Sequence, residues 1–431
     1  MRSISFVLIV TSLVSPGISA HCRASLVTDA VSRFAGYGID ALSDSFAHDD
    51  FESNTIYKVL KEKNEFSMLV KLIDKVPRVR EMLDGDKRLT FFAPTNDALE
   101  RYHNVPGFPT GGDDKNRMDK ILEDTFKYSM IPCVIESRMF GENSTIVTQL
   151  RARDGSFDDA ERRIKIQAGG GSIQKATINN YVHVTQADVP AKNGIIHVID
   201  APLYLPPDIM DIVYMLPQKL SITATALLKT NLQSNYEFNS GYKKKSGNDQ
   251  ERLGHHNDRY GQGSPDTTLF VPTNEAWERL PEDLLLYLFS PRGERTLRKL
   301  MAFHTLPDNI VFTEWNRQVH NRHSFFDDED LSFEWDKHFN SCIDQKMPVH
   351  VKKSKNRSSE SNKYNVQLQA HGIYSHVIDN PAQNGVFHTL PQVLSPRRVE
   401  GINEEQNQKD WEEWKDWLME WSSKHHEEES N

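Results

Sequence analysis

The chain has 431 residues, and 61 acidic against 51 basic residues give it a formal charge of −10. This length predicts two or three domains, and the negative charge argues against a nucleic-acid-binding protein, which normally carries a basic face. Three cysteines are too few for a disulfide-dense scaffold, a zinc ribbon or an iron–sulfur protein. A disulfide between Cys133 and Cys342 would have to bridge distant segments and is not expected.

Residues 1–20 have the pattern of a signal peptide. A basic residue is followed by the apolar stretch 4–14 and by a small residue at the expected cleavage point. We expect no membrane-spanning helix, because no later run reaches the roughly 18 apolar residues that such a helix needs. The chain is therefore expected to enter the secretory pathway, and sequons at Asn143 and Asn356 predict glycosylation on that route.

Two pairs of short segments show that the chain repeats itself. Residues 89–98 resemble residues 267–276, and residues 193–197 resemble residues 384–388, in the same order each time. The two repeats start about 180 residues apart, which is too long a period for a solenoid. The pattern predicts two duplicated domains.

Each first segment predicts a strand, a sharp turn and a capped helix. In the first repeat, the apolar run that ends at Ala93 is typical of a buried strand. Pro94 should end the pairing of that strand. Thr95 or Asn96 can then cap the following helix by accepting a hydrogen bond from an unpaired backbone N–H.

Each second segment begins with Asn-Gly, which predicts a hairpin turn because both residues tolerate a positive φ. Alternation over 181–185 and apolar residues over 195–199 predict the two paired strands. Upstream of each first segment, apolar residues recur at helical steps, and Pro217 separates two helices in the second repeat. Each repeat is thus expected to be an α+β unit.

The paired segments resemble the two signatures of the fasciclin-like adhesion domain (fasciclin I type), over residues 53–207 and 210–396. The chain is similar to fungal fasciclin domain-containing proteins. The resemblance implies two tandem β-wedge domains wrapped by helices. Such domains usually act as non-catalytic adhesion or interaction modules, here toward protein or glycan partners at the cell surface, wall or lumen, without a cofactor or metal. It also makes the vacuole lumen an alternative to secretion, because similar fungal proteins are often vacuolar.

The resemblance further implies one contact site. In animal relatives an Asp-Ile pair just before the Asn-Gly turn contacts integrins. The matching positions here are Asp188 and Val189, with a poor match at Asp379-Asn380. A partner-contact role is carried over only to Asp188 and Val189, and the plainer alternative for them is a solvent-facing strand end.

Four histidine or tyrosine positions have a structural interpretation. His197 and His388 lie among apolar neighbours, so we expect buried rings that hydrogen-bond to the backbone. The family's Tyr-His pair between the two signatures is replaced by Tyr128-Ser129 and by Phe303-His304, so each repeat departs from the pattern at one position.

Two polar stretches interrupt the second repeat and are interpreted as insertions. Residues 234–266 are expected to be disordered, and residues 315–363 to be irregular. His320 and His323 precede an acidic run in the second stretch. Their spacing matches no known metal-binding loop, so a polar loop is expected there rather than a metal site.

Residues 399–431 form an acidic tail with a net charge of −8. Tryptophans recur in it at helical steps, which predicts an amphipathic helix with an indole stripe. Docking on its own domain is the favoured interpretation, and contact with a partner protein is the alternative. The residues of the stripe are Trp411, Trp414, Trp417 and Trp421.

These observations favour a non-catalytic interaction protein. The sequence has no HExxH, G-x-S-x-G, phosphate-loop or CxxC motif, so nothing in it points to an enzyme. A carbohydrate-binding cell-wall protein is the alternative, and an unrecognised hydrolase is the least favoured hypothesis. The oligomeric state is not predicted.

Overall fold

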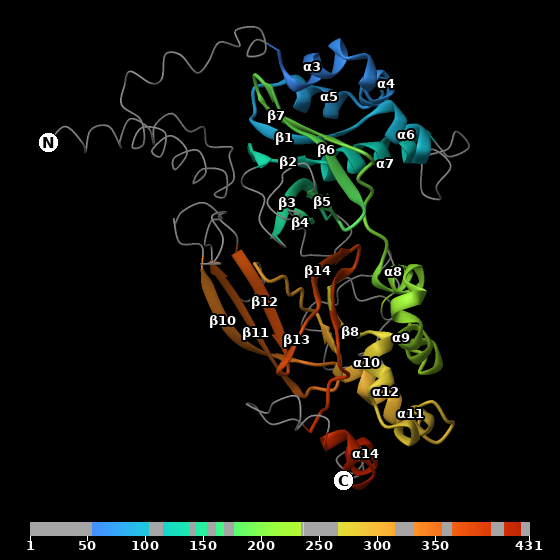
Figure 1. The fold of residues 1–431 in the computed structure, drawn as a ribbon. Helices are drawn as coiled ribbons and strands as arrows, with labels where there is room; N and C mark the ends of the chain where they lie inside the picture. The colour runs from blue at the N-terminus through green and yellow to red at the C-terminus, as the bar shows by residue number, and fades with distance from the viewer. Residues whose placement is uncertain are drawn as a thin grey trace, which may run out of the picture.

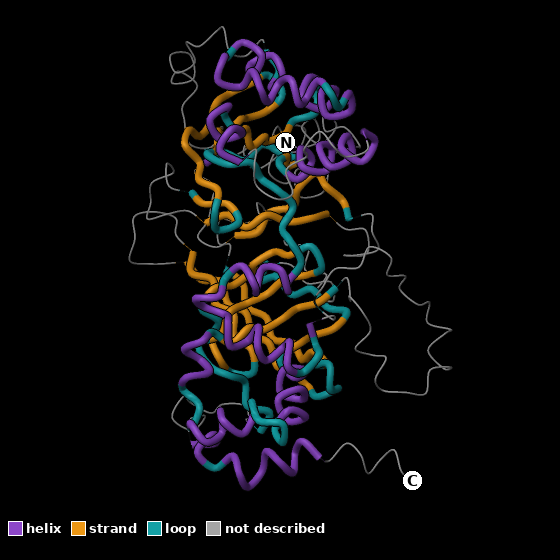
Figure 2. The backbone as a smooth tube through the Cα atoms, turned by 90° about the vertical axis from the view of Figure 1, so that its right-hand side faces the viewer, coloured by secondary structure: helices purple, strands orange, loops and turns teal. Residues whose placement is uncertain are grey.

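A computed structural model describes residues 54–102, 115–137, 144–152, 161–167, 176–233, 236, 266–314, 332–355, 364–397 and 409–423. It contains two domains stacked end to end, with a C-terminal helix at the far end of the second domain (Figure 1). The helices of the first domain lie at one end of the molecule, and strands of both domains meet in the middle (Figure 2).

The first domain places its helices before most of its strands. The helix that starts at Ile56 is capped by the Thr55 side chain, and the helix over 77–84 begins with a proline, whose fixed φ suits a first helical position. The elements are α3 (Ile56–Glu62), η2 (Asn64–Phe66), α4 (Ser67–Asp74), α5 (Pro77–Asp84), β1 (Leu89–Pro94), α6 (Asn96–Tyr102), α7 (Lys115–Tyr128), β2 (Met130–Ile131), β3 (Ser144–Arg151), β4 (Glu161–Gln167), β5 (Thr177–Ile178), β6 (Val182–Ala191) and β7 (Gly194–Ile199).

The second domain repeats this order. Pro217 begins its second helix, and Thr273 caps the helix after the signature strand by accepting from the N–H of Ala276. The elements are α8 (Ile209–Met215), α9 (Pro217–Lys229), β8 (Thr267–Pro272), α10 (Asn274–Glu278), α11 (Glu282–Leu288), α12 (Glu294–Phe303), β9 (Thr305–Pro307), β10 (Phe333–Asn340), β11 (Lys346–Lys355), β12 (Tyr364–Ala370), β13 (Ile373–Tyr374), β14 (Val377–Ala382) and β15 (Gly385–Leu390), followed by α14 (Trp414–Ser423).

In both domains the strands of the two repeated segments pair with each other in parallel. β1 runs beside β7 from Leu89 opposite Gly194, and β8 runs beside β15 from Thr267 opposite Gly385. The first domain has one sheet in the order β2-β1-β7-β6-β5-β4-β3. The described strands of the second domain form two sheets, β10-β11-β12-β13 and β14-β15-β8-β9. The α+β class is confirmed.

The Asn-Gly turn of the first domain joins three separate segments. The side chain of Asn193 accepts from the backbone N–H of Ile56 at 2.8 Å and donates to the carbonyls of Leu83 at 2.9 Å and Gly85 at 2.7 Å. At Gly194, φ is +153° and an added Cβ would lie 1.8 Å from a backbone oxygen of β1. Only glycine allows that approach.

The turn of the second domain repeats the arrangement. The side chain of Asn384 accepts from the N–H of Ile209 at 3.0 Å and donates to the carbonyl of Tyr236 at 2.7 Å. At Gly385 an added Cβ would lie 1.8 Å from the carbonyl oxygen of Thr267. The Asn-Gly pair therefore acts as a tertiary clamp as well as a hairpin turn.

The prediction that residues 315–363 are an irregular insertion is wrong for residues 332–355. They contain β10 and β11, the edge strand and its neighbour in the sheet β10-β11-β12-β13. Alternate residues of β11 pack into the apolar core, and they are Met347, Val349 and Val351. The polar residues around them, including the lysines at 346, 352 and 353, obscured this alternation in the sequence. Of residues 234–266, the structure describes Tyr236, which is buried, and Asp266.

Candidate functional site

A buried histidine and an aspartate form the same hydrogen-bonded pair in both domains. In the second domain, Asp379 has a φ of 56°, and its backbone N–H donates to Nδ1 of His388 at 3.0 Å. Nε2 of His388 donates to the carbonyl of Val311 at 2.8 Å. The Asp379 carboxylate accepts from the backbone N–H of Thr313 at 2.8 Å and also from its hydroxyl. The pair fastens the β14–β15 hairpin to the segment after β9.

The first domain builds the same pair with different surroundings. The N–H of Asp188 (φ 61°) donates to Nδ1 of His197 at 3.3 Å, and Nε2 of His197 donates to the carbonyl of Ile135 at 2.9 Å. The Asp188 carboxylate accepts from the N–H of Ser137 at 2.8 Å and from its hydroxyl. Asp188 is exposed, whereas Asp379 is fully buried and lies near Lys165 and Arg163 of the first domain.

Both histidines are buried and neutral. Burial lowers the pKa of His388 to about 3 and lowers that of His197 as well. Each ring uses both nitrogens in hydrogen bonds to the backbone, so neither ring is available as a base or a metal ligand. The prediction of buried histidines that hydrogen-bond to the backbone is confirmed.

The altered Tyr-His positions also have structural partners. The hydroxyl of Tyr128 donates to the carbonyl of Arg163 at 3.0 Å. His304 donates through Nδ1 to the carbonyl of Leu300 at 2.8 Å and accepts at Nε2 from the N–H of Leu394 at 2.9 Å. Burial lowers the pKa of His304 to about 4. Each domain therefore keeps one half of the pair as a buried brace.

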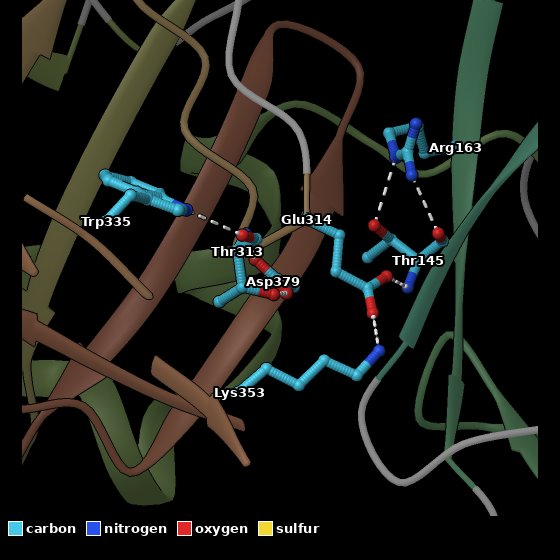
Figure 3. Close-up of polar contacts among 7 residues, drawn as sticks. All are labelled: Thr145, Arg163, Thr313, Glu314, Trp335, Lys353 and Asp379. Atoms are coloured by element: carbon cyan, nitrogen blue, oxygen red, sulfur yellow. Dashed lines mark hydrogen bonds and ion pairs between the residues drawn. The ribbon is translucent and has the colours of Figure 1, made fainter. Parts of the chain in front are cut away.

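The outer face of β4 packs against the second domain and buries charged side chains there (Figure 3). Arg163 donates to the hydroxyl of Thr145 at 3.0 Å and to its carbonyl at 2.7 Å. The N–H of Thr145 donates across the junction to Oε2 of Glu314 at 3.1 Å, and Oε1 of Glu314 accepts from Nζ of Lys353 at 2.7 Å. The side chains of Glu314 and Lys353 are only 3% and 7% exposed.

A second set of contacts crosses the junction beside the first. Nζ of the fully buried Lys165 donates to the carbonyl of Ile378 at 2.7 Å. The amide of Asn180 donates to the side-chain oxygen of Asn380 at 3.0 Å. A small apolar cluster joins the domains at the same place, formed by Ala152, Ile310, Phe312 and Val386.

Several ionisable side chains at the junction are buried, among them Lys165, Asp379 and Glu314. Burial lowers the pKa of Lys165 to about 8 and raises that of Asp379 to about 6. Burial also raises the pKa of Glu314, although Lys353 and Arg163 oppose this by attracting its charged form. Buried charges without partners would be costly, and these contacts offset part of that cost.

A family model described as "Fasciclin domain" matches residues 64–206 and 219–396, and each match falls within one of the two structural domains. The chain belongs to the fasciclin domain family. Fasciclin domains are typically adhesion or interaction modules, and the structure shows how this chain joins two of them.

Curated relatives agree with this family. Protein sll1483 of Synechocystis sp. is 32% identical, and the match covers 36% of this chain and 74% of that protein. The aurofusarin biosynthesis cluster protein S of Gibberella zeae is 24% identical, with 62% of this chain and 58% of that protein covered. A fasciclin-like arabinogalactan protein of Arthroderma benhamiae is 23% identical, with 59% and 53% covered. The chain thus spans little more than half the length of these two fungal relatives.

Among solved structures, the chain matches a FAS1 domain pair from the insect cell adhesion molecule fasciclin I. The identity is 15%, the TM-score is 0.33, and the match covers 78% of this chain and 98% of that chain.

The two predicted contact residues of the first fasciclin domain have different surroundings. Val189 is only 7% exposed and packs in the core beside the helices, so its side chain cannot meet a partner. This corrects the expectation for Val189, which arose because the sequence does not show which way the strand faces. Asp188 is exposed, and its role in partner contact stays a prediction.

The tail docks on the second fasciclin domain, as the favoured interpretation expected. The Trp414 ring stacks on Tyr287 at 5.0 Å, and Nζ of Lys299 lies 4.4 Å from the centre of the Trp421 ring. Trp421 is half-buried, and the other three indoles of the stripe are at most 9% exposed. The helix docks because its indole rings are more stable against an apolar core than in water. As a result, a partner cannot reach the rings of Trp411, Trp414 and Trp417 in this arrangement.

Several predictions fall on residues outside the described ranges. They are the signal peptide over 1–20, both sequons at Asn143 and Asn356, and the polar loop with His320 and His323.

Three observations concern the cysteines, the helices and the metal-ligating side chains of the described residues. Cys133 and Cys342 are not bonded to each other and lie in different domains. Within the described ranges, no helix is both long and apolar enough to cross a membrane. Within the same ranges, no three metal-ligating side chains converge on one point.

The amino-acid sequence did not predict the junction between the two domains. Arg163 and Lys165 alternate with apolar residues on β4, which is the usual pattern of a strand with one solvated face. Only the presence of the second domain against that face makes them buried. One feature of the sequence could have suggested the junction. One strand of the first domain carries two cations on the same face, and the second domain carries the acidic residues Glu314 and Asp379 that could pair with them.

Proposed function

We propose that this chain is a non-catalytic adhesion protein of the secretory pathway that presents two fixed fasciclin domains to protein or glycan partners. The observation that carries the proposal is the use of the Asp–His pair as a brace in both domains. Groups that could perform acid–base chemistry are instead consumed in backbone hydrogen bonds. The family, whose domains are typically adhesion modules, supports the same conclusion.

Asp188 is the proposed contact of the first domain. It is exposed, unlike its counterpart Asp379, and it lies at the edge of the β6–β7 hairpin. The test is attachment of cells to plates coated with the full chain. Asp188→Ala should reduce attachment at least several-fold, whereas Asp86→Ala, which changes a side chain that is 96% exposed elsewhere in the domain, should not.

The same preparation tests the absence of catalysis. It is incubated with panels of ester, glycoside and peptide substrates. Attachment without turnover would support the proposal. Turnover that disappears after a single substitution would overturn it in favour of a hydrolase.

Carbohydrate binding is the second candidate, and one surface favours it. Asp336, His350, Gln369 and Tyr374 lie opposite one another in a row across β10, β11, β12 and β13. Tyr374 is 53% exposed, so the row combines an open aromatic ring with polar side chains, which suits a sugar ring. Glycan-array signal that is lost in Tyr374→Ala and kept in Tyr214→Ala, a change at another exposed tyrosine, would support this candidate.

We also propose that the chain is secreted, with the vacuole lumen as the alternative. The signal-peptide pattern of residues 1–20 supports entry into the pathway. A fluorescent fusion at the C-terminus, followed with fractionation of medium and vacuoles, distinguishes the two destinations. Cytosolic fluorescence would contradict both.

A further inference from the structure

The junction contains an internal comparison, because the same aspartate occurs once covered and once open. Asp188 and Asp379 have the same backbone conformation and accept the same pair of hydrogen bonds, from a backbone N–H and a hydroxyl. They differ in that the first domain lies over Asp379. Asp188 therefore shows the surroundings that Asp379 has when the domains are apart.

The groups that face the two junction carboxylates come from every element around them. Lys165 and Arg163 on β4 attract Asp379, while His388 on β15, which is neutral, bonds its backbone. Glu314 faces Lys353 on β11, Arg163 on β4 and the N–H of Thr145 on β3. Glu161 is the third carboxylate near Arg163, at the more exposed end of β4.

Docking removes the two carboxylates from water. A carboxylate loses more solvation free energy than a protonated carboxyl when it is buried. The facing cations recover part of that loss, and burial is nevertheless the largest influence on both groups. The docked arrangement thus binds protons at these sites more tightly than the separated domains do.

We propose that acid locks the two fasciclin domains together, because docking of the first domain on the second takes up protons at Asp379 and Glu314. The docked arrangement is then stronger at pH 5 than at neutral pH, and the junction is a proton-linked clamp. Lys165 titrates in a higher pH range than these carboxylates, because burial lowers its pKa only to about 8. It therefore loses its proton in alkaline solution and does not produce the effect at pH 5.

The size of the effect follows from proton linkage. The pKa of Asp379 rises from the ordinary 3.8 to about 6 in the docked arrangement. Such a change makes the docking equilibrium constant on the order of tenfold larger at pH 5 than at pH 7.5. Glu314 adds to this in the same direction, because its pKa is also raised.

The experiment measures domain separation in the full chain. Small-angle X-ray scattering is recorded in graded urea at pH 5 and at pH 7.5, while far-UV circular dichroism and tryptophan fluorescence follow the folding of each domain. We expect the chain to expand before the domains unfold, and to require more urea at pH 5. Asp379→Asn should reduce the pH difference strongly, and Asp188→Asn, the matched change at the open aspartate, should retain it.

Three results would overturn the proposal. The first is an equal or lower urea midpoint for expansion at pH 5 in the unmodified chain. The second is a full pH difference in folded Asp379→Asn, or, if that variant does not fold, in Glu314→Gln. The third is expansion that occurs only together with domain unfolding, because the junction would then not be a separate clamp.

Discussion

Asn193 and Asn384, the asparagines of the two Asn-Gly turns, each hold separate segments of one domain together. Substituting each in turn tests this role, with one domain serving as the control for the other. Asn384→Ala removes two buried hydrogen bonds. It leaves the N–H of Ile209 without its partner, while the carbonyl of Tyr236 keeps the longer bond from the N–H of Met210 at 3.4 Å. The buried N–H left without a partner costs about 1–3 kcal/mol, and the lost bond to the Tyr236 carbonyl costs about 0.5–1.5 kcal/mol. The free energy of unfolding of the second domain should therefore fall by about 2–4 kcal/mol.

The assay is urea unfolding followed by tryptophan fluorescence. All seven tryptophans lie at or after Trp277, so the fluorescence reports the second domain and the tail. Asn193→Ala strands three groups in the first domain, so it should shift the far-UV circular dichroism transition and leave the fluorescence midpoint nearly unchanged. A fluorescence midpoint that does not move in Asn384→Ala, or that moves as far in Asn193→Ala, would refute the reasoning.

Three further predictions use the same fluorescence signal. Gly385→Ala places a Cβ 1.8 Å from a backbone oxygen of β8, so we expect no folded second domain; near-normal unfolding would contradict this. Burial holds the pKa of His388 at about 3 and of His304 at about 4, below the ordinary 6.5. These two contributions are complete above pH 6.5 and are lost as the pH falls toward 4, and together they exceed the opposite effect of Asp379, whose pKa is raised to about 6. The unfolding free energy should thus drop by on the order of 2 kcal/mol from pH 7 to pH 5, and a flat profile would oppose this. Trp414→Ala should destabilise the second domain by about 3 kcal/mol. Met419→Ala, at a side chain that is 45% exposed on the same helix, should change it by less than about 0.5 kcal/mol, and equal effects would show that the tail is not packed.

The sequence by itself determined the local structure of the repeated segments. The strand, turn and capped helix over 89–102 and the hairpin around Gly194 depend on residues a few positions apart, whose preferences act before any tertiary contact forms. The burial of His197 also followed from its apolar neighbours. The spacing of the repeated segments likewise predicted the duplication, and the order of helical and strand patterns predicted the α+β class. The spacing of the tryptophans predicted the amphipathic tail.

Only the tertiary structure decided which segments meet. The parallel pairing of β1 with β7 joins residues about 100 positions apart, and the Asp188 carboxylate meets Ser137 from a distant loop. The polar composition of residues 332–355 did not predict the two strands that they contain. Lys353, for example, is a charged residue that is buried because it pairs with Glu314, which lies 39 positions away in the sequence. The largest difference concerns β4. Its alternating pattern predicts that Arg163 and Lys165 are solvent-exposed, but both are buried where the second domain packs against them. A side chain's exposure depends on everything packed around it, and that cannot be read from its own neighbours along the chain.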